Sequence, residues 1–302
     1  MLPIIVKASG FILVILLAYV LKQKGILTSE HGRGFSTILM TVTLPCALLV
    51  STRSLNMSAI LLIPMGLGIA GNLLLLGIGY LRGRHKEPVA QAQDMIQLVG
   101  YNIGTFAFPF VQSFFPASYL MQVILFDTGN ALMVFGGNYT ITSLVSRVGE
   151  QVTLKAIFKK LFRSVPFCTY LLCFGLSLWN ITLPTALLTL AKLGADANPF
   201  VAMLTLGLMV DFRLSRQDLK ELGQLIGLRV FASFLMLVCL YQLPIDLVIK
   251  KMLAICLIAP ISVVTPLYAR ELGSESALPA TVNSLSIVIS IILMTVLILF
   301  VS

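Results

Sequence analysis

Two apolar segments of this chain contain prolines in their interior, at residues 100–109 and 257–266. Pro109 lies in the first segment, and Pro260 and Pro266 lie in the second. Proline removes a backbone donor and clashes with the preceding turn, so each segment is predicted to form two half-helices joined by unwound chain. The resumed half-helices would present free N–H groups and positive dipole ends, which bind anions. The two segments therefore predict an anion-binding site.

Polar side chains beside these breaks could complete such a site. The amide of Asn102 could hold a carboxylate or satisfy loose backbone, and Ser262 and Thr265 supply hydroxyl groups. Asn130 and Asn283 follow the two breaks, and for them both a hydrogen-bonding role and substrate contact remain open. The predicted substrate site consists of Asn102, Ile103, Gly104, Pro109, Pro260, Ser262, Thr265, Pro266, Asn130 and Asn283.

Charged residues inside apolar segments are expensive and often functional. Asp127 and Asp196 could each bind and release a proton during transport, or form a structural hydrogen bond between helices. Lys192 precedes Asp196 by one helical turn and could partly neutralise it. Arg229 could balance an anionic substrate, pair with an aspartate or extend its charged group to the membrane surface. Together with Asp94, the residues Asp127, Asp196 and Arg229 form a candidate proton or charge relay.

The elements that must position these residues are membrane-spanning helices. The chain has 302 residues, of which 58% are hydrophobic and 11% charged, whereas soluble domains contain about 25% charged residues. Apolar runs long enough to cross a bilayer repeat along the whole chain and leave no room for a soluble domain. We expect spans at about 3–21, 35–52, 58–81, 89–115, 117–145, 157–179, 183–210, 217–242, 247–269 and 276–301.

The basic residues predict the orientation of these spans. The net charge of +9 comes mostly from loops after the odd-numbered spans, so it indicates membrane topology rather than nucleic-acid binding. Because cytoplasmic loops are enriched in Lys and Arg, we expect both termini on the outer side. The five cysteines lie inside spans without the spacing of a metal site. The simplest location for the protein is a bacterial inner membrane.

Two halves of opposite orientation are predicted. Each half has an odd number of spans, so the halves must point oppositely through the bilayer. Pro45 in span 2 corresponds to Pro199 in span 7, Pro109 to Pro266, and Asn130 to Asn283. This order is typical of an inverted repeat in which the broken spans 4 and 9 cross near the midplane. The predicted boundaries are 1–145 for the first repeat, 146–156 for a cytoplasmic linker and 157–302 for the second repeat.

Three runs of residues carry a resemblance to a known family: Thr43-Leu44-Pro45-Cys46-Ala47-Leu48-Leu49, Ala202-Met203-Leu204-Thr205-Leu206-Gly207-Leu208 and Val264-Thr265-Pro266-Leu267-Tyr268-Ala269-Arg270-Glu271. In order and spacing, from about residue 11 to residue 300, the chain resembles the auxin efflux carrier family. That family includes the plant PIN-type auxin exporters and bacterial malate and malonate permeases. The resemblance implies a ten-helix fold like that of the bile acid/sodium symporters, with a scaffold panel and a transport domain. It also implies organic anions as substrates, a role for Asn102 in binding them, and a homodimer in many members.

The sequence therefore predicts an all-α secondary transporter that moves a small organic anion by alternating access. The substrate would be a mono- or dicarboxylate, auxin-like or malate/malonate-like, and the membrane potential would drive its export. Proton-coupled carboxylate uptake is the alternative, and an anion channel is less favoured because no repeated ring of charge is present. We expect no enzyme activity, because His31 and His85 lie in loops and no catalytic set is present. No cofactor, metal or sodium cage is expected, and the partners are the organic anion, the lipid bilayer and a second copy of the chain.

Overall fold

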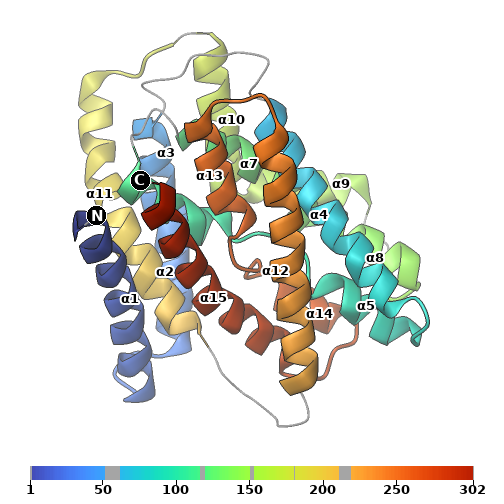
Figure 1. Cartoon of the computed structure of the whole chain (residues 1–302). Helices are drawn as coiled ribbons and strands as arrows, with labels where there is room; N and C mark the ends of the chain where they lie inside the picture. Colours follow the sequence, from blue (N-terminus) through green and yellow to red (C-terminus); the bar gives the residue numbers. More distant parts are fainter. Residues whose placement is uncertain are drawn as a thin grey trace.

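The computed structural model describes residues 2–51, 62–115, 120–149, 153–179, 181–210 and 219–301. Within these ranges every regular element is a helix (Figure 1). The first half contains α1 Leu2–Gln23, α2 Ser29–Ile38, η1 Leu39–Thr43, α3 Leu44–Ser51, α4 Leu62–Gly83, α5 Pro88–Ile96, η4 Ile103–Ala107, α6 Phe108–Phe114, α7 Leu120–Leu132, η6 Met133–Gly137 and α8 Asn138–Ser146. The second half contains α9 Leu154–Arg163, α10 Val165–Leu178, α11 Thr185–Met209, α12 Leu219–Gln242, α13 Leu247–Leu257, α14 Thr265–Glu271 and α15 Leu278–Val301. The η elements are single wide turns of π-helix that join the α-helices on either side.

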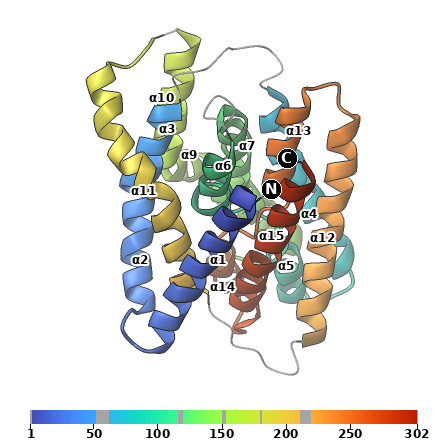
Figure 2. The ribbon, with the colours of Figure 1, turned by 60° about the vertical axis from the view of Figure 1, so that its left-hand side comes forward.

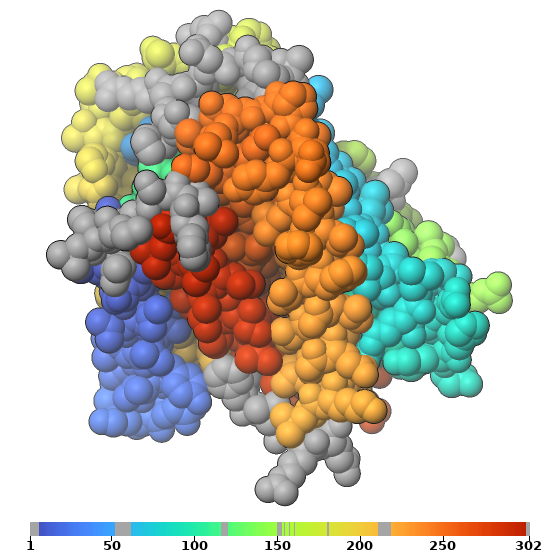
Figure 3. Space-filling view, in the orientation of Figure 1, coloured from blue at the N-terminus to red at the C-terminus, as the bar shows by residue number. Residues whose placement is uncertain are grey.

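The helices have the length and the surface of a membrane protein. Six helices among the described residues are long and apolar enough to cross a bilayer: Val6–Gln23, Ser29–Ser51, Leu62–Gly83, Leu120–Ser146, Leu219–Gln242 and Leu278–Leu299. Their outer faces carry large apolar side chains. Figure 3 shows α12 and α15 side by side on one face of the molecule. In these two helices Phe231, Phe234 and Ile292 are each more than half exposed. Since water disfavours so much exposed apolar surface, these faces fit a lipid environment.

The helices form two groups with the broken segments between them (Figure 2). In one group α1, α2 and α3 pack against α11, and in the other α4 packs against α5, α7 and α12. α1 and α15 also pack together. The most buried part of the chain runs from α5 into α6, where almost every side chain from Ala92 to Val111 is shielded from solvent. The interior of the protein is thus built around the first predicted break.

Glycine allows α4 and α7 to approach closely. A Cβ atom at Gly129 of α7 would lie 2.1 Å from the carbonyl oxygen of Met65 in α4, and one at Gly68 would lie 2.3 Å from the carbonyl oxygen of Phe126. Small residues at helix interfaces bring backbones together in membranes. Gly68 and Gly129 therefore allow the close contact, whereas nothing lies within 4 Å of a Cβ atom at Gly66.

The first break lies earlier in the chain than predicted. The sequence predicted unwound chain within residues 100–109, but α5 ends at Ile96 and the irregular chain covers residues 98–102. The helix resumes with the wide turn η4, and Pro109 falls in the first turn of α6. A proline needs no backbone donor at the start of a helix, so the wide turn before it accommodates the ring without unwinding the chain.

The second break agrees more closely with the prediction. α13 ends at Leu257 and α14 begins at Thr265, so the chain from Ile258 to Val264 contains no regular helix. Pro260 lies inside this break and Pro266 in the first turn of α14. Proline thus terminates the incoming helix here and begins the outgoing one.

Other predicted spans differ from the observed helices. Span 157–179 is not one helix, because Ser164 caps a new helix and Pro166 follows in its first turn, which divides the segment into α9 and α10. α9 is amphipathic, with Lys155, Lys159 and Arg163 exposed. Span 183–210 is the continuous helix α11, which runs through Pro199. Several basic residues used for the predicted orientation, including Arg53, Arg213 and Arg216, lie outside the described residues, as does part of the predicted linker 146–156.

Candidate functional site

The unwound backbone of the first break lies in the interior, and side chains from other helices hydrogen-bond much of it. Arg229 donates to the carbonyl oxygens of Leu98 and Gly100, and Asn130 donates to the carbonyl oxygen of Tyr101. The N–H groups of the break donate to side chains as well: Gly100 to the Oδ1 atom of Asn72 at 2.9 Å, and Tyr101 to the Oδ1 atom of Asn130 at 3.1 Å. Buried backbone groups without partners are costly, so polar side chains from other helices are what make this break stable.

The second break is held in the same way. The Nδ2 group of Asn283 in α15 donates to the carbonyl oxygens of Ile261 and Ser262, at 2.8 and 3.1 Å. The N–H of Ile261 donates to the hydroxyl of Ser286. Ser233 donates to the carbonyl oxygen of Leu257 at the end of α13. Asn130 and Asn283, which the sequence paired, therefore each bind the backbone of the break that precedes them.

The two breaks touch each other. The backbone N–H of Asn102 donates to the carbonyl oxygen of Pro260 at 2.8 Å, and the hydroxyl of Thr265 donates to the carbonyl oxygen of Val99 at 3.1 Å. Gly100 has a φ of 85°, and a Cβ atom on it would lie 2.8 Å from the Cβ of Ser262. Glycine is needed here both for the left-handed backbone and for the close approach.

Arg229 of α12 joins both breaks and behaves differently from the prediction. Its guanidinium donates to the carbonyl oxygens of Leu98 at 2.5 Å, Gly100 at 2.8 Å and Ala259 at 3.3 Å. It also lies 4.3 Å from the ring centre of Tyr101. The expectations of an aspartate partner or of an extended side chain at the membrane surface are therefore wrong. Free carbonyl groups beyond the two helix ends supply the acceptors instead.

A cluster of three buried asparagines supports the first break from behind. Asn72 of α4 donates to the Oδ1 atom of Asn130 in α7, and Asn138 of α8 donates to the Oδ1 atom of Asn72. Because Asn130 also binds Tyr101, the cluster ties three helices to the unwound chain. Such a network fixes the backbone more firmly than single bonds, since each amide orients the next.

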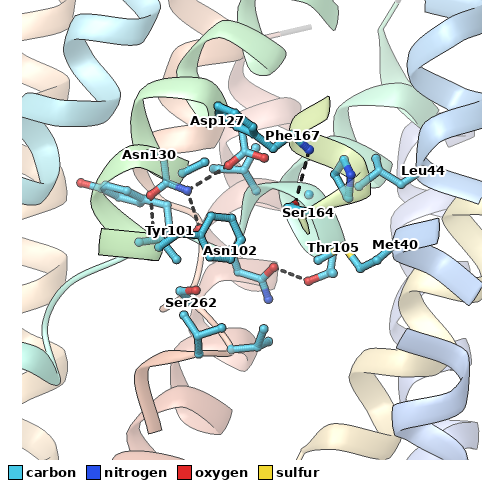
Figure 4. Close-up of a pocket in the computed structure, with 18 of the residues that line it drawn as sticks. Met40, Leu44, Tyr101, Asn102, Thr105, Asp127, Asn130, Ser164, Phe167 and Ser262 are labelled. Atoms are coloured by element: carbon cyan, nitrogen blue, oxygen red, sulfur yellow. Dashed lines mark hydrogen bonds between the residues drawn. The ribbon is translucent and has the colours of Figure 1, made fainter. Parts of the chain in front are cut away.

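A cavity of about 100 Å³ lies beside the point where the breaks meet (Figure 4). The first break supplies Asn102, Ile103 and Gly104, and the second supplies Ser262. The remaining wall comes from α7, from the region of Met40 and Leu44, and from the start of α10. Its polar side chains are Tyr101, Asn102, Thr105, Asp127, Asn130, Ser164, Tyr170 and Ser262. Among the residues lining it there is no Lys, Arg or His.

Asn102 presents an unused donor at this cavity. Its Oδ1 atom accepts a hydrogen bond from the hydroxyl of Thr105, as Figure 4 shows. Its Nδ2 group is buried and has no hydrogen-bond partner. A buried polar group without a partner costs about 1–3 kcal/mol. An acceptor atom of a ligand in the cavity would remove that cost.

Asp127 is the acidic side chain of the cavity. It is 8% exposed, and each of its oxygen atoms has a partner from the protein. Tyr170 of α10 donates to its Oδ2 atom at 2.5 Å, and Asn130 donates to its Oδ1 atom at 2.9 Å. Since Asn130 also holds the backbone of Tyr101, the carboxyl group is linked through one side chain to the first break.

The other predicted site residues lie away from the cavity. Asp94 forms ion pairs with Arg82 and Lys86 at the end of α4. Asp196 pairs with Lys192 along an exposed face of α11, where its side chain is 64% exposed. Pro109, Pro260, Thr265, Pro266 and Asn283 shape or hold the breaks without lining the cavity. The structure thus brings together Asn102, Ile103, Gly104, Asp127, Asn130 and Ser262.

The sequence prediction did not include several residues of the site. Tyr101, Thr105 and Tyr170 line the cavity, and Asn72 and Asn138 form the amide cluster behind it. The two asparagines could have been found from their type alone, because an amide inside an apolar helix needs a partner there. Tyr170 carries no comparable signal, since a tyrosine is common in apolar segments.

Comparison with known proteins gives a similarity to a transporter. No family model matches the chain. A protein of Methanothermobacter thermautotrophicus that bears the name "Uncharacterized transporter" is 26% identical to this chain over 230 residues, which cover 74% of each protein. The chain is thus a helical membrane protein that is similar to a transporter.

Proposed function

We propose that this protein is a secondary transporter that moves a small organic anion across the membrane by alternating access. The observation that carries the proposal is the unpartnered Nδ2 group of Asn102, which lies at a cavity between two unwound segments. Transporter substrate sites are typically formed by such interrupted helices at the interface of two repeats. The similarity to a protein named as a transporter supports the same class.

We also propose a family and a membrane topology for the chain. We assign the chain to the auxin efflux carrier family, with ten spans in two inverted repeats, crossing broken helices and both termini on the outer side of a bacterial inner membrane. The matched roles of Asn130 and Asn283 support the repeat, because each binds the backbone of its own break. The separation of α1, α2, α3 and α11 from α4, α5, α7 and α12 supports a scaffold and a moving domain.

The size of the cavity and the backbone around it support a small carboxylate as the substrate. Its volume of about 100 Å³ is well below the roughly 300–1,000 Å³ of pockets for drug-sized ligands, which favours a short mono- or dicarboxylate over a larger aromatic acid. The first turn of the helix that begins at Ile103 supplies backbone N–H groups, which bind anions without a charged side chain. Asn102 would add a side-chain donor to this backbone contribution.

The direction of transport follows from charge. An inside-negative potential acts on a monoanion with about 2.3 kcal/mol per 100 mV, or about fifty-fold in concentration ratio, and therefore favours export without a coupled ion. Asp127 favours a second possibility, proton-coupled uptake, because a carboxyl group lines the same cavity and is linked to the first break through Asn130. Net uptake would require such a proton.

Ligand binding and flux together test the proposal. Purified protein should be stabilised against thermal unfolding by some members of a panel of short carboxylates, since a ligand that binds only the native state raises its stability. In proteoliposomes, a carboxylate that stabilises the protein should show saturable uptake, stimulated by the same carboxylate inside. Flux without saturation or countertransport would identify a channel. Absence of stabilisation by every carboxylate, with stabilisation by cations or neutral solutes, would reject the organic-anion class.

A further inference from the structure

A permanent positive charge lies where two half-helices end. α5 and α13 both stop in the interior of the protein, and their C-terminal ends carry the negative partial charge of the helix dipole. The guanidinium of Arg229 binds the carbonyl oxygens of Leu98 and Gly100 beyond α5 and that of Ala259 beyond α13. One side chain from α12 therefore neutralises both helix ends.

In transporters with broken helices, unwound carbonyl groups and half-helix C-terminal ends are where a coupling cation such as Na⁺ binds. Carbonyl oxygens are the ligands that K⁺ channels also use in place of water. In this protein the guanidinium occupies that place. We infer that Arg229 is a built-in cation that replaces a coupling metal cation, so that the transporter works without Na⁺ or K⁺.

The surroundings of Arg229 hold its charge in place. The residue is 5% exposed, and its guanidinium lies against the ring of Tyr101. Among the residues that the structure describes, no Asp or Glu forms an ion pair with it. Arginine stays protonated at neutral pH, so the charge cannot leave during the transport cycle as a dissolved ion would. The helix ends rather than a carboxylate balance this charge.

Removing the side chain would leave a polar space. A small cavity of about 20 Å³ already lies beside Arg229, lined among others by Ser233, Ala259, Ser286 and Ser290. A cavity of this size holds about one water molecule. In Arg229→Ala, this space would join the volume of the lost guanidinium and expose three carbonyl oxygens and serine hydroxyls. These are suitable ligands for a monovalent cation with its remaining water.

The experiment measures thermal unfolding of the purified full-length protein in NaCl, KCl and N-methylglucamine chloride at one ionic strength. For the wild-type protein, and likewise for Arg229→Lys, the unfolding temperature should be the same in all three salts. Arg229→Ala should unfold at a lower temperature in N-methylglucamine chloride and recover part of the loss in NaCl or KCl. Lys22→Ala is the matched control, since Lys22 donates to the carbonyl oxygen of Val210 at 2.6 Å, away from both breaks.

The outcome decides the inference in every case. A wild-type protein that is stabilised specifically by Na⁺ or K⁺ would overturn it, and so would a folded Arg229→Ala that ignores the cation. If Arg229→Ala does not fold in any salt, titration of the wild-type protein with radioactive Na⁺ settles the question, because saturable binding contradicts the inference and its absence supports it. Only the statement that transport works without Na⁺ or K⁺ rests on the proposed function. None of these measurements uses a substrate, so a wrong carboxylate assignment would not affect them.

Discussion

At the scale of single residues, the amide of Asn102 has two ends with different surroundings. Thr105 donates to its oxygen, whereas its nitrogen is buried beside the cavity without a partner. This asymmetry distinguishes Asn102 from Asn72, Asn130 and Asn283, whose amides bind backbone or each other. Of the two asparagines that line the cavity, Asn102 is the one whose amide nitrogen has no partner, and this indicates a ligand there.

Replacing Asn102 should weaken substrate binding. Asn102→Ala removes a donor to a carboxylate, and a hydrogen bond to a charged group contributes about 1.5–3 kcal/mol. We expect the Kd for a carboxylate identified by thermal shift to rise about 10- to 100-fold, as measured by calorimetric titration. Asn198→Ala is the control, because Asn198 is equally buried but binds Thr43 and Gln112. Unchanged affinity in a folded Asn102→Ala would assign that residue to the support of the break.

Replacing Asp127 should separate coupled from uncoupled transport. Asp127→Asn resembles the permanently protonated carboxyl group, so in a proton-coupled carrier flux driven by a pH gradient should fall while substrate-for-substrate exchange continues. In an uncoupled exporter, flux driven by the membrane potential should persist in the variant. Asp196→Asn is the matched control, since Asp196 pairs with Lys192 on an exposed face and should not affect either flux. Potential-driven flux in the wild-type protein that ignores pH would exclude the proton-coupled alternative.

At the scale of elements, the sequence predicted that two segments break, but it misplaced the first break. Proline marks a break because of its own geometry, so both segments could be found from the sequence. The position of the first break depends on Gly100 and on hydrogen bonds from Arg229, Asn72 and Asn130, which lie in other helices. No local pattern contains that information. Likewise, the cavity wall at Tyr170 depends on how α10 packs, which only the folded chain determines.

The close contact of the two breaks should make Gly100 intolerant of a side chain. Gly100→Ala places an L-residue in the left-handed region, which costs about 1–2 kcal/mol, and adds a contact of 2.8 Å with Ser262. Gly25→Ala is a control with the same backbone handedness, a φ of 72°, and open space around it. We expect a clearly larger loss of thermal stability for Gly100→Ala than for Gly25→Ala. Equal losses would show that the two breaks can separate at little cost.

The packing of α4 against α7 gives a second prediction at this scale. Gly129→Ala adds a methyl group 2.1 Å from the carbonyl oxygen of Met65, and overpacking of this kind costs about 1–3 kcal/mol. Gly66→Ala in α4 meets no atom within 4 Å and should be neutral or stabilising, because alanine favours helix more than glycine. Thermal unfolding of both variants in detergent measures the difference. A stable Gly129→Ala would contradict the close helix contact.

At the scale of the whole molecule, the proposed topology places the loop after α1 in the cytoplasm and the loop between α12 and α13 outside. In a variant without the five native cysteines, Lys24→Cys should react with a membrane-impermeant maleimide only after the cells are permeabilised. Pro244→Cys should react in intact cells. Both positions are exposed, so a difference in labelling reports the side of the membrane. The opposite pattern would invert the orientation and the direction of the proposed potential-driven flux.

The wide turns η1, η4 and η6 have a consequence for how this protein and its relatives diverge. Two of them directly precede a helix whose second residue is a proline, Pro45 in α3 and Pro109 in α6. A π-helical turn contains about one residue more than an α-helical turn, and one residue corresponds to about 100° of rotation. Because the wide turn holds the extra residue locally, deleting it would close the turn to an ordinary α-helical one and leave the later side chains facing the same way, whereas a deletion elsewhere in the helix would rotate them away from their contacts. We therefore expect single-residue insertions and deletions among relatives to concentrate at these turns, and to occur together with loss of the following proline.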